Sequence, residues 1–463
     1  MTRLPDAAPS VTDTVPRDLE TLPKVSVLPG IFRKSPFFFL SEAAREQGGF
    51  VRLKIGPRSV YLVSDPHMFQ HILRDNVRNY QKSKFLYNAA KPMVGEGLLT
   101  SEGDFWLRQR RMIQPQFHRQ KVASFATMMT DAVDEIMLTW QQEDQQQAGE
   151  VDLGERMAQL TVEIVSRTLF GTATLTPSEI AHLGQDMMAA SNYVALRGYM
   201  PFIPQSIPVP GSRRFERAMV HLTQAVNTII RAGETDQTAG DNLITMLLHT
   251  TDEETNERMT HKQLFDEVMT AFSAGFETTA TALTWIWYLL AQYPDVEQKM
   301  REEVDRVVGD RTPTLEDIMQ LTYCRQALQE SMRFYPPIPM LPRTALADDT
   351  LGGYHIPKGT ILLLFYHGLH HNAEYWPDPE IFDPERFSPT RTESQHRFAY
   401  LPFSAGPRKC IGNEFAMMEG TLVLAMLLQR YRITLADQVV RPNLSATLKP
   451  SRGIRASMQR IAD

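Results

Sequence analysis

The chain has 463 residues, of which 43% are hydrophobic, 22% charged and 9% aromatic, so it can build a sizeable core and is not disordered as a whole. Its 48 Lys and Arg residues face 54 Asp and Glu, a net charge of −6, which gives no overall electrostatic reason to bind nucleic acid or an anionic membrane. Two cysteines, Cys324 and Cys410, are too few for a disulfide framework or a four-thiolate metal site and are typical of a reducing compartment, the cytoplasm.

The N-terminal region carries prolines at positions 5, 9, 16, 23 and 29 and no apolar run that would act as a signal or anchor. We expect residues 1–22 to form a flexible tail and residues 23–463 to form one domain. No later segment approaches the ~18 uncharged apolar residues of a membrane span, so no transmembrane anchor is expected. Neither an internal repeat nor a long interior linker divides the chain.

Residues 50–63 alternate apolar and polar side chains around a Gly-Pro-Arg turn, which predicts a hairpin of half-buried strands. Beyond it, apolar residues recur at three- and four-residue intervals, which predicts helices at 105–112, 122–140, 160–169, 180–194, 213–232 and 242–249. The segment 199–211 is rich in proline and apolar residues. We interpret it as a structured loop packed on the core, with a mobile substrate lid that touches a membrane as the alternative.

The longest helical pattern runs from residue 263 to residue 293, long enough to cross a whole domain. A second helix is expected to end just before Pro336-Pro337, because a residue that precedes proline disfavours helical backbone. Short strands with turns follow between residues 351 and 361. Together these patterns predict a mainly α fold with minor β structure: one helix-rich domain with small antiparallel sheets.

The most specific pattern is PFSAGPRKCIG at residues 402–412, which fits Phe-x-x-Gly-x-Arg-x-Cys-x-Gly and precedes an apolar helix. A cysteine just before a helix N-terminus meets backbone N–H groups and the positive end of the helix dipole, which lower its pKa and favour the thiolate that a metal needs. The flanking glycines let the backbone lie close to a flat ligand, and Arg408 can pair with a carboxylate. A lone cysteine is usually an inert core residue, but the matched spacing favours a metal ligand at Cys410.

With this motif the chain resembles the cytochrome P-450 family of haem-thiolate monooxygenases from about residue 23 to the C-terminus. The resemblance implies a cytochrome P-450 fold around a buried haem b (iron protoporphyrin IX), with Cys410 as the axial thiolate ligand of the iron. It also implies that Phe403 shields the ligand loop, that Gly406 lets the loop approach the haem and that Arg408 pairs with a haem propionate. Cys324 matches no motif, and we interpret it as a buried small apolar residue.

A second pattern, AGFETT at residues 274–279, lies in the middle of the long helical segment. By itself it predicts a kink, since Gly275 permits local distortion and the Thr278 hydroxyl can bond the Ala274 carbonyl one turn back. In the family this pairing of an acid with an alcohol lies above the haem and supplies protons for oxygen activation. The resemblance therefore assigns a proton relay to Glu277 and Thr278.

A third pattern pairs Glu330 with Arg333 at i,i+3, which alone would be a solvated ion pair of little consequence. The family has the same Glu-x-x-Arg before a Pro-rich segment. The resemblance implies that both residues form a buried network with Arg386 and hold the segment that carries Cys410.

A fourth pattern places Trp106 and Arg110 four residues apart, hence on one face of an early helix. By resemblance both residues meet a haem propionate, and Arg343 meets one as well. The alternative for Arg343 is a charge on the surface of a strand.

Several cations cluster near these motifs in the sequence and are expected to form a local basic face beside the thiolate: Arg108, Arg111, Arg119, Lys121 and Lys409. Such a face would suit an acidic electron-transfer protein, with solvated helix charge as the alternative. Because no flavin or iron–sulfur motif is found, we expect electrons from NAD(P)H to arrive through partners, a ferredoxin or flavodoxin with its reductase.

The function implied by the resemblance is a monooxygenase that uses O2 and two electrons to hydroxylate or epoxidise a lipophilic small molecule. Segments 85–99, 193–202, 271–278, 338–341 and 446–448 are expected to line its pocket and are mostly apolar. Fatty acids, terpenoids and polyketides all stay open as substrates. The YWPDP stretch at residues 375–379 resembles the fatty-acid and membrane-type branches of the family, and with no anchor we expect a soluble, monomeric, bacterial-type enzyme.

Two alternatives remain at this stage. One keeps the haem thiolate but uses no external reductant, as an isomerase, a dehydratase or a peroxygenase would. The other is a non-catalytic haem sensor. The presence of both Glu277 and Thr278 favours the monooxygenase.

Overall fold

The computed structural model describes residues 16–26, 35–55, 58–146, 149–171, 175–199, 203–204, 206–235 and 242–461. The α-helices are α2 (Pro36–Gln47), α3 (Pro66–Gln70), α4 (Lys84–Val94), α5 (Gly103–Ile113), α6 (Arg119–Ala123), α7 (Ala126–Gln146), α8 (Leu153–Phe170), α9 (Pro177–Tyr199), α10 (Ser212–Thr235), α11 (Leu243–His249), α12 (His261–Gln292), α13 (Pro294–Val307), α14 (Leu315–Gln320), α15 (Thr322–Phe334), α16 (Tyr366–His370), α17 (Pro389–Thr392) and α18 (Asn413–Arg430). Shorter helical turns are η1 (Leu19–Thr21), η2 (His71–Asp75), η3 (Val77–Asn79), η4 (Gln114–Phe117), η5 (Pro384–Phe387) and η6 (Gly406–Arg408).

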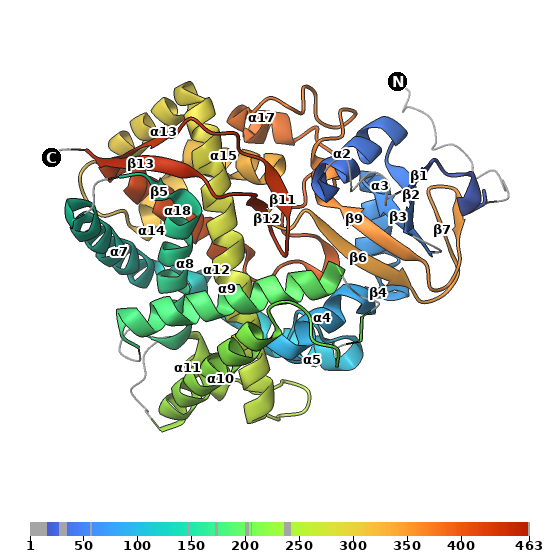
Figure 1. The fold of residues 1–463 in the computed structure, drawn as a ribbon, viewed down its shortest axis with the longest axis horizontal. Coiled ribbons are helices and arrows are strands. Elements are labelled where there is room, and N and C mark those ends of the chain that lie inside the picture. Colours follow the sequence, from blue (N-terminus) through green and yellow to red (C-terminus); the bar gives the residue numbers. More distant parts are fainter. Residues whose placement is uncertain are drawn as a thin grey trace, which may run out of the picture.

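The strands are β1 (Lys24–Ser26), β2 (Phe50–Ile55), β3 (Arg58–Val63), β4 (Tyr80–Lys82), β5 (Val151–Asp152), β6 (Met340–Ala345), β7 (Asp349–Leu351), β8 (Tyr354–Ile356), β9 (Ile361–Phe365), β10 (Tyr431–Leu435), β11 (Pro442–Leu444), β12 (Leu448–Pro450) and β13 (Arg455–Arg460). The largest sheet has the order β1-β2-β3-β9-β6-β4 and lies beside the helical part of the molecule (Figure 1). Smaller sheets are β10-β13-β5, β11-β12 and β7-β8.

The prediction of a mainly α fold with minor β structure is confirmed, but the largest sheet is mixed and not antiparallel. The hairpin expected at residues 50–63 is present as β2 and β3, with Leu53 opposite Val60. On either side of it, β1 pairs with β2 and β9 pairs with β3 in parallel. Long connections separate these partners in sequence, and parallel pairing needs such crossovers. The alternation of apolar and polar residues in one hairpin does not predict which distant strands pair with it.

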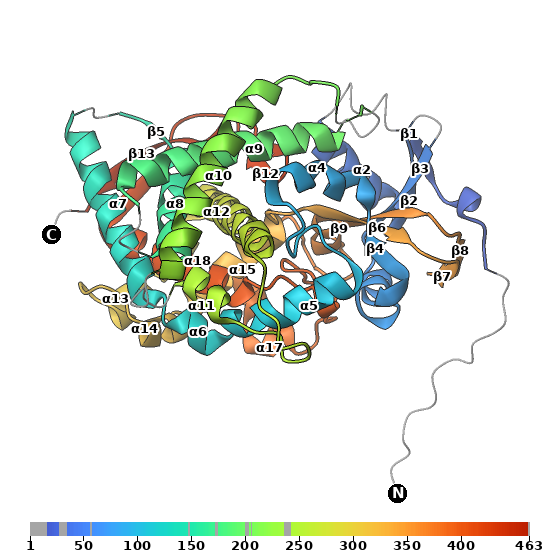
Figure 2. The same ribbon diagram turned by 90° about the horizontal axis from the view of Figure 1, so that it is seen from below.

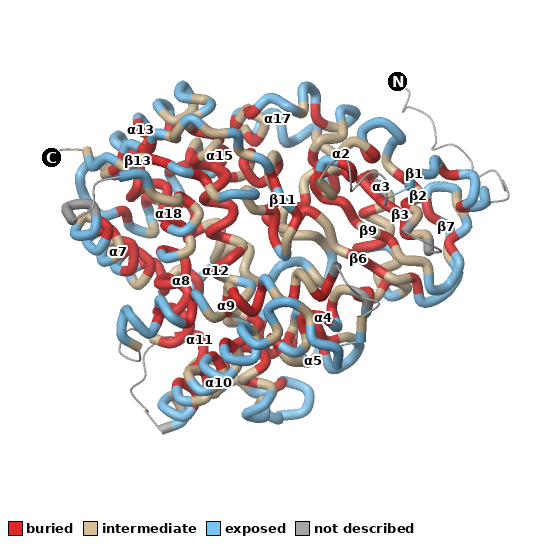
Figure 3. Tube along the Cα trace, in the orientation of Figure 1, coloured by how far each residue is buried: buried red, intermediate tan, exposed pale blue. Residues whose placement is uncertain are grey.

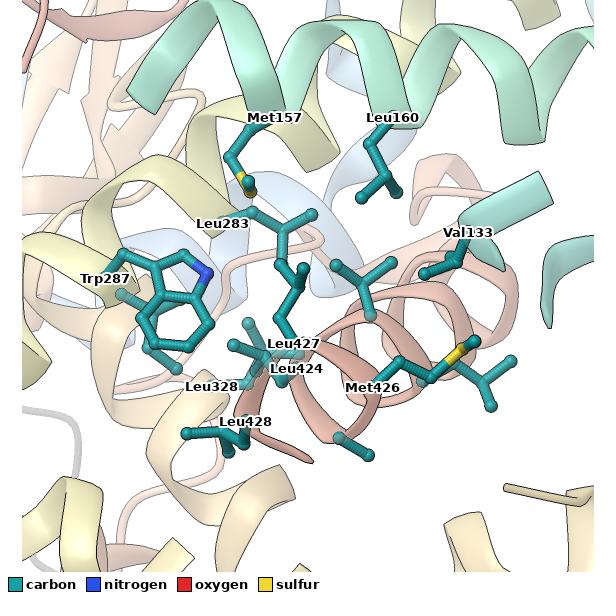
Figure 4. Close-up of a cluster of buried hydrophobic side chains, with 14 of the residues drawn as sticks. Val133, Met157, Leu160, Leu283, Trp287, Leu328, Leu424, Met426, Leu427 and Leu428 are labelled. Atoms are coloured by element: carbon teal, nitrogen blue, oxygen red, sulfur yellow. The ribbon is translucent and has the colours of Figure 1, made fainter. Parts of the chain in front are cut away.

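The helical part packs around α12, which passes through its middle (Figures 1 and 2). Buried segments concentrate on α8, α12 and α18 (Figure 3). In the main cluster, Leu283 and Trp287 of α12 lie among side chains of α8, α15 and α18 such as Leu160, Leu328 and Leu427 (Figure 4). Cys324 belongs to the same cluster and is fully buried, which confirms its interpretation as a small core residue.

α12 is helical without a break from His261 to Gln292, close to the range expected from its pattern. Its N-terminus is fixed by a capping box between Thr260 and Gln263. The predicted stop before the proline pair is also confirmed, since α15 ends at Phe334. In the part of the chain that the structure describes, no helix is both long and apolar enough to span a membrane.

The N-terminal boundary lies earlier than residue 23. Leu19 and Leu22 are 5% exposed and pack in the cluster formed by the largest sheet, and the Arg17 backbone N–H donates to the Gly353 carbonyl at 2.8 Å. The predicted tail of residues 1–22 is therefore too long, because two leucines between prolines are enough to fix the chain on the sheet. Residues 1–15 lie outside the described residues, as do parts of the 199–211 loop.

Candidate active site

The loop that carries Cys410 is a tight turn between η6 and α18. The Cys410 backbone N–H donates to the Phe403 carbonyl at 2.9 Å, which closes the loop. Phe403 packs against the main core cluster. The Cys410 thiol is exposed, although it lies deep enough between protein segments for burial to raise its pKa. The Gly412 N–H, Arg110 and Lys409 act in the opposite direction, but burial outweighs them, contrary to the expected net lowering.

Gly406 in this loop has no room for a side chain. Its φ is +69°, and a Cβ would lie 1.8 Å from the Leu73 carbonyl oxygen of η2. We therefore expect Gly406→Ala to lower the free energy of unfolding by about 2 kcal/mol or more, because positive φ and a backbone clash add. Thermal denaturation checks this, with Gly149→Ala as the control, since a Cβ there meets open space. Equal melting temperatures for the two variants would contradict the prediction.

The middle of α12 faces a surface that the protein does not cover. Phe276 and Leu283 of this helix are fully buried, yet Ala274 is exposed and Thr278 is only partly buried. The Thr278 hydroxyl donates to the Ala274 carbonyl at 2.7 Å, as its spacing predicted. An exposed alanine halfway along the central helix indicates space for a ligand at this point.

Three cations gather beside the Cys410 loop around one carboxylate. Arg408 forms an ion pair with Glu102 and stacks on the Trp106 ring, 4.3 Å from its centroid. Arg343 on β6 is 4% exposed and lies opposite Lys82 of β4. Burial, together with repulsion from both arginines, lowers the pKa of Lys82 to about 7. The group is therefore more positive than its acidic partner can balance.

Within the described residues, Arg343 has no ion-pair partner, and Glu102 satisfies only part of the Arg408 guanidinium. Arg343 contacts only neutral oxygens, those of Tyr87 and Pro342, at 3.4 and 3.0 Å. Arg408 has a buried Nη1 atom without a hydrogen-bond partner. Buried charges and donors that are left unsatisfied are costly, so this group fits a ligand that brings carboxylates.

Arg110 and Trp106 lie on one face of α5, as their spacing predicted, but they contact different parts of the site. Trp106 is buried beneath Arg408. Arg110 donates to the Lys409 carbonyl at 2.9 Å, next to Cys410. The helix thus connects the cationic group to the cysteine loop.

Glu277 is buried and points towards the C-terminal hairpin β11-β12. Its Oε1 accepts a hydrogen bond from Thr447 at 3.0 Å and pairs with Lys449 at 2.8 Å. Successive residues on a helix point about 100° apart, which is why Glu277 and the neighbouring Thr278 contact different groups. The acid and the alcohol are adjacent in the sequence without being hydrogen-bonded to each other.

The Glu330, Arg333 and Arg386 network has the expected form. Arg333 makes two bonds to the Glu330 carboxylate, at 2.7 and 2.8 Å, and both side chains are fully buried. Arg386 Nε approaches Glu330 Oε1 at 3.4 Å. Arg333 also donates to the His370 carbonyl, and His370 Nε2 accepts from the Leu401 N–H at 2.9 Å. The network thus reaches the segment that leads into the Cys410 loop.

Sequence patterns did not reveal Lys82, Glu102, Glu419 or Lys449. Glu419 on α18 is fully buried, and neither carboxylate oxygen has a hydrogen-bond partner within the described residues, so burial raises its pKa well above the usual range. None of these residues belongs to a sequence motif, because the groups around each of them come from other segments of the chain. A lone charged residue within an apolar stretch, such as Glu419 in α18, was the only available signal.

The predicted basic face is smaller than expected. Arg108 and Arg111 pair with acids of the segment 252–257, including Asp252. These ion pairs neutralise the charges of Arg108 and Arg111. The sequence did not predict the pairs because the acids lie more than a hundred residues later in the chain. Arg119, Lys121 and Lys409 make no ion pair within the described part of the chain.

Comparison with known proteins shows the family of this chain. A model of the cytochrome P-450 family matches residues 16–457. The chain belongs to the cytochrome P-450 family. It is a cytochrome P-450 monooxygenase, an oxidoreductase with a haem-thiolate cofactor, as the cysteine motif predicted.

Similar proteins cover nearly the whole chain. Cyclooctat-9-en-7-ol 5-monooxygenase from Streptomyces melanosporofaciens is 33% identical over 93% of this cytochrome P-450 and 91% of its own length. Pentalenene oxygenase from Streptomyces avermitilis is 30% identical over 91% of this chain and 92% of its own. A solved cytochrome P450DA heme domain has a TM-score of 0.86 and 26% identity, covering 95% of this chain and 98% of that chain.

Proposed function

We propose that this cytochrome P-450 oxidises a lipophilic small molecule, with cyclic terpenoids as the first class to test and fatty acids and polyketides as the others. The observation that carries the proposal is the full-length similarity to enzymes named for a cyclooctatenol and for pentalenene. The predicted pocket segments support it: Leu86, Ala271, Ile338 and Ala446 leave apolar surface uncovered on α4, on α12, before β6 and at the hairpin tip.

The residues of the site fit a haem. Cys410 would hold its iron through the thiolate, and the net positive group of Lys82, Arg343 and Arg408 would bind its two propionates, with Trp106 holding Arg408 in place. Arg110 would steady the ligand loop through the Lys409 carbonyl. Haem held by a thiolate supplies the activation of dioxygen and favours O–O cleavage.

Glu277 and Thr278 would supply the protons. The Thr278 hydroxyl now donates to the Ala274 carbonyl, and rotation about its Cα–Cβ bond presents the Oγ1 proton to the open side of α12. The Glu277 carboxylate is the acid next to it in the chain and can restore that proton. These two roles also favour a monooxygenase over an isomerase, which needs no proton delivery.

We expect Thr278→Ala to bind haem normally and to consume NAD(P)H while yielding less product and more peroxide, at least ten-fold less product per NAD(P)H. The measurement is product and peroxide per NAD(P)H oxidised. Thr284→Ala is the matched control, because Thr284 lies on the same helix and donates to the Ala280 carbonyl at the same 2.7 Å. Unchanged coupling in Thr278→Ala, or equal uncoupling in both variants, would defeat the proposed role.

Electrons would come from NAD(P)H through a ferredoxin or flavodoxin and its reductase, with the enzyme acting as a monomer. Of the predicted basic face, Arg119, Lys121 and Lys409 of the Cys410 loop keep their charges free of ion pairs within the described residues, which supports an acidic partner. Because opposite surface charges speed the association of the two proteins and salt screens them, the rate at which the partner reduces the enzyme should fall as ionic strength rises.

A spectral screen tests the substrate class directly. The purified enzyme is titrated with a cyclic sesquiterpene, dodecanoic acid and a macrolide, and the low-spin to high-spin shift of the Soret band is recorded. The proposal expects the largest shift and the lowest Kd with the terpene. A shift with dodecanoic acid alone would replace terpenoids by fatty acids as the substrate class.

A further inference from the structure

Lys449 is the charged partner of Glu277, and it comes from the far end of the chain. The two side chains form an ion pair of 2.8 Å, with side-chain exposures of 25% for Lys449 and 5% for Glu277. The Lys449 ammonium also lies 3.1 Å from the Met188 sulfur of α9. The acid is therefore almost sealed from water, and its partner lies between it and the outside.

The hairpin that carries Lys449 is fixed rigidly against α12. Trp285 donates its indole N–H to the Leu448 carbonyl at 2.6 Å, and the Leu448 N–H donates to the Pro337 carbonyl at 2.9 Å. On the same side of α12, Thr281 donates to Thr447, the residue that also bonds Glu277. Lys449 thus reaches Glu277 from a strand whose position on the helix is set by hydrogen bonds.

Two other carboxylates near α12 make no ion pair with Lys449 within the described residues. Glu163 of α8 pairs with Arg167, which also pairs with Glu135. Glu419 of α18 lies near Thr279 of α12. Within the described residues, no other charged group contacts the Glu277 carboxylate. Burying a charged side chain is costly unless it is paired, and Lys449 is the charged partner of the Glu277 carboxylate.

We infer that Lys449 is the positioning residue for Glu277: its ion pair holds the carboxylate in one orientation, against the hairpin, between proton deliveries. This inference rests on the proposed relay role of Glu277. A proton that arrives from solvent passes to Glu277 Oε1, the ion pair opens, and the acid turns towards Thr278 to pass the proton on. The carboxylate then returns to Lys449, so that each cycle moves one proton and leaves both residues unchanged.

The first part of the test asks whether the pair exists in solution and does not depend on turnover. Melting temperatures of the haem-loaded parent, Lys449→Met, Glu277→Gln and the double variant form a mutant cycle. Lys449→Met should lower the melting temperature by about 2 °C in the parent and have no effect in the Glu277→Gln background. Equal losses in both backgrounds would show that the two residues do not interact.

The second part asks whether the pair serves catalysis. With NADPH, a plant-type ferredoxin and its reductase, and the compound selected by the spectral screen, Lys449→Met should form at least three-fold less product per NADPH, with an unchanged spectral Kd. Lys449→Arg should restore the yield, because it keeps the charge. Lys262→Met is the matched control: it breaks a 2.5 Å ion pair with Asp266 on the same helix and should not change the yield.

The outcomes separate the two proposals. If Glu277→Gln lowers the yield while Lys449→Met does not, Lys449 is merely structural and the inference is overturned. If Glu277→Gln itself leaves the yield unchanged, the relay role fails, whatever Lys449 does. A loss of yield in Lys449→Met that Lys449→Arg does not rescue would also contradict the inference, since charge would then not be the property that matters.

Discussion

Glu330→Gln is expected to destabilise this cytochrome P-450 by about 3–5 kcal/mol, because it leaves the Arg333 guanidinium buried without a counter-charge. Both side chains are fully buried, and Arg333 also donates hydrogen bonds to the carbonyls of His370 and Pro379. The variant should melt at a lower temperature and lose haem, because the same network supports the segment before Cys410.

Chemical denaturation followed by circular dichroism, together with haem content, measures this effect. Lys91→Ala is the control, because it breaks an equally short but exposed pair, Lys91 with Glu96 at 2.8 Å. Exposed pairs contribute little. A Glu330→Gln variant as stable as Lys91→Ala would show that the buried pair is dispensable.

Cys410→Ser is expected to abolish product formation while leaving the fold intact. The thiol is exposed, so a hydroxyl of similar size should keep the melting temperature of the haem-free chain. A serine oxygen does not give iron the electron density that favours O–O cleavage. Product formation from the selected substrate should fall below detection.

Cys324→Ala is the matched control for this variant. Cys324 is fully buried in the main core cluster, where it hydrogen-bonds to Glu303 and Met300, so its replacement should lower stability slightly and leave product formation unchanged. Product formation by Cys410→Ser, or its loss in Cys324→Ala, would contradict the assignment of the two cysteines.

The spacing of apolar residues predicted those elements of the fold that depend on a single segment of the chain. The central helix, the stop at Phe334 and the hairpin at residues 50–63 follow from periodicity, proline and turn residues within one segment. The mixed sheet does not, because β9 joins β3 from about 300 residues later in the chain. The packing of Leu19 and Leu22 was missed for the same reason, since their partners lie on distant strands.

The same distinction between local and long-range contacts applies to the residues of the candidate site. Residues in a dense motif, such as Cys410, Gly406 and Arg408, were found from the sequence because the turn itself constrains each position. Lys82 and Lys449 were not found, because each is a single lysine whose role depends on tertiary contacts. Electrostatic partners across more than a hundred residues have no local pattern that a sequence alone would display.

The most direct test of the account is the absorbance difference spectrum of the dithionite-reduced, haem-loaded protein after addition of carbon monoxide. Thiolate ligation by Cys410 predicts the red-shifted Soret band that distinguishes haem-thiolate proteins, present in the wild type and in Cys324→Ala and absent in Cys410→Ser. A wild-type protein that binds haem without this band, or a Cys410→Ser variant that retains it, would contradict the account.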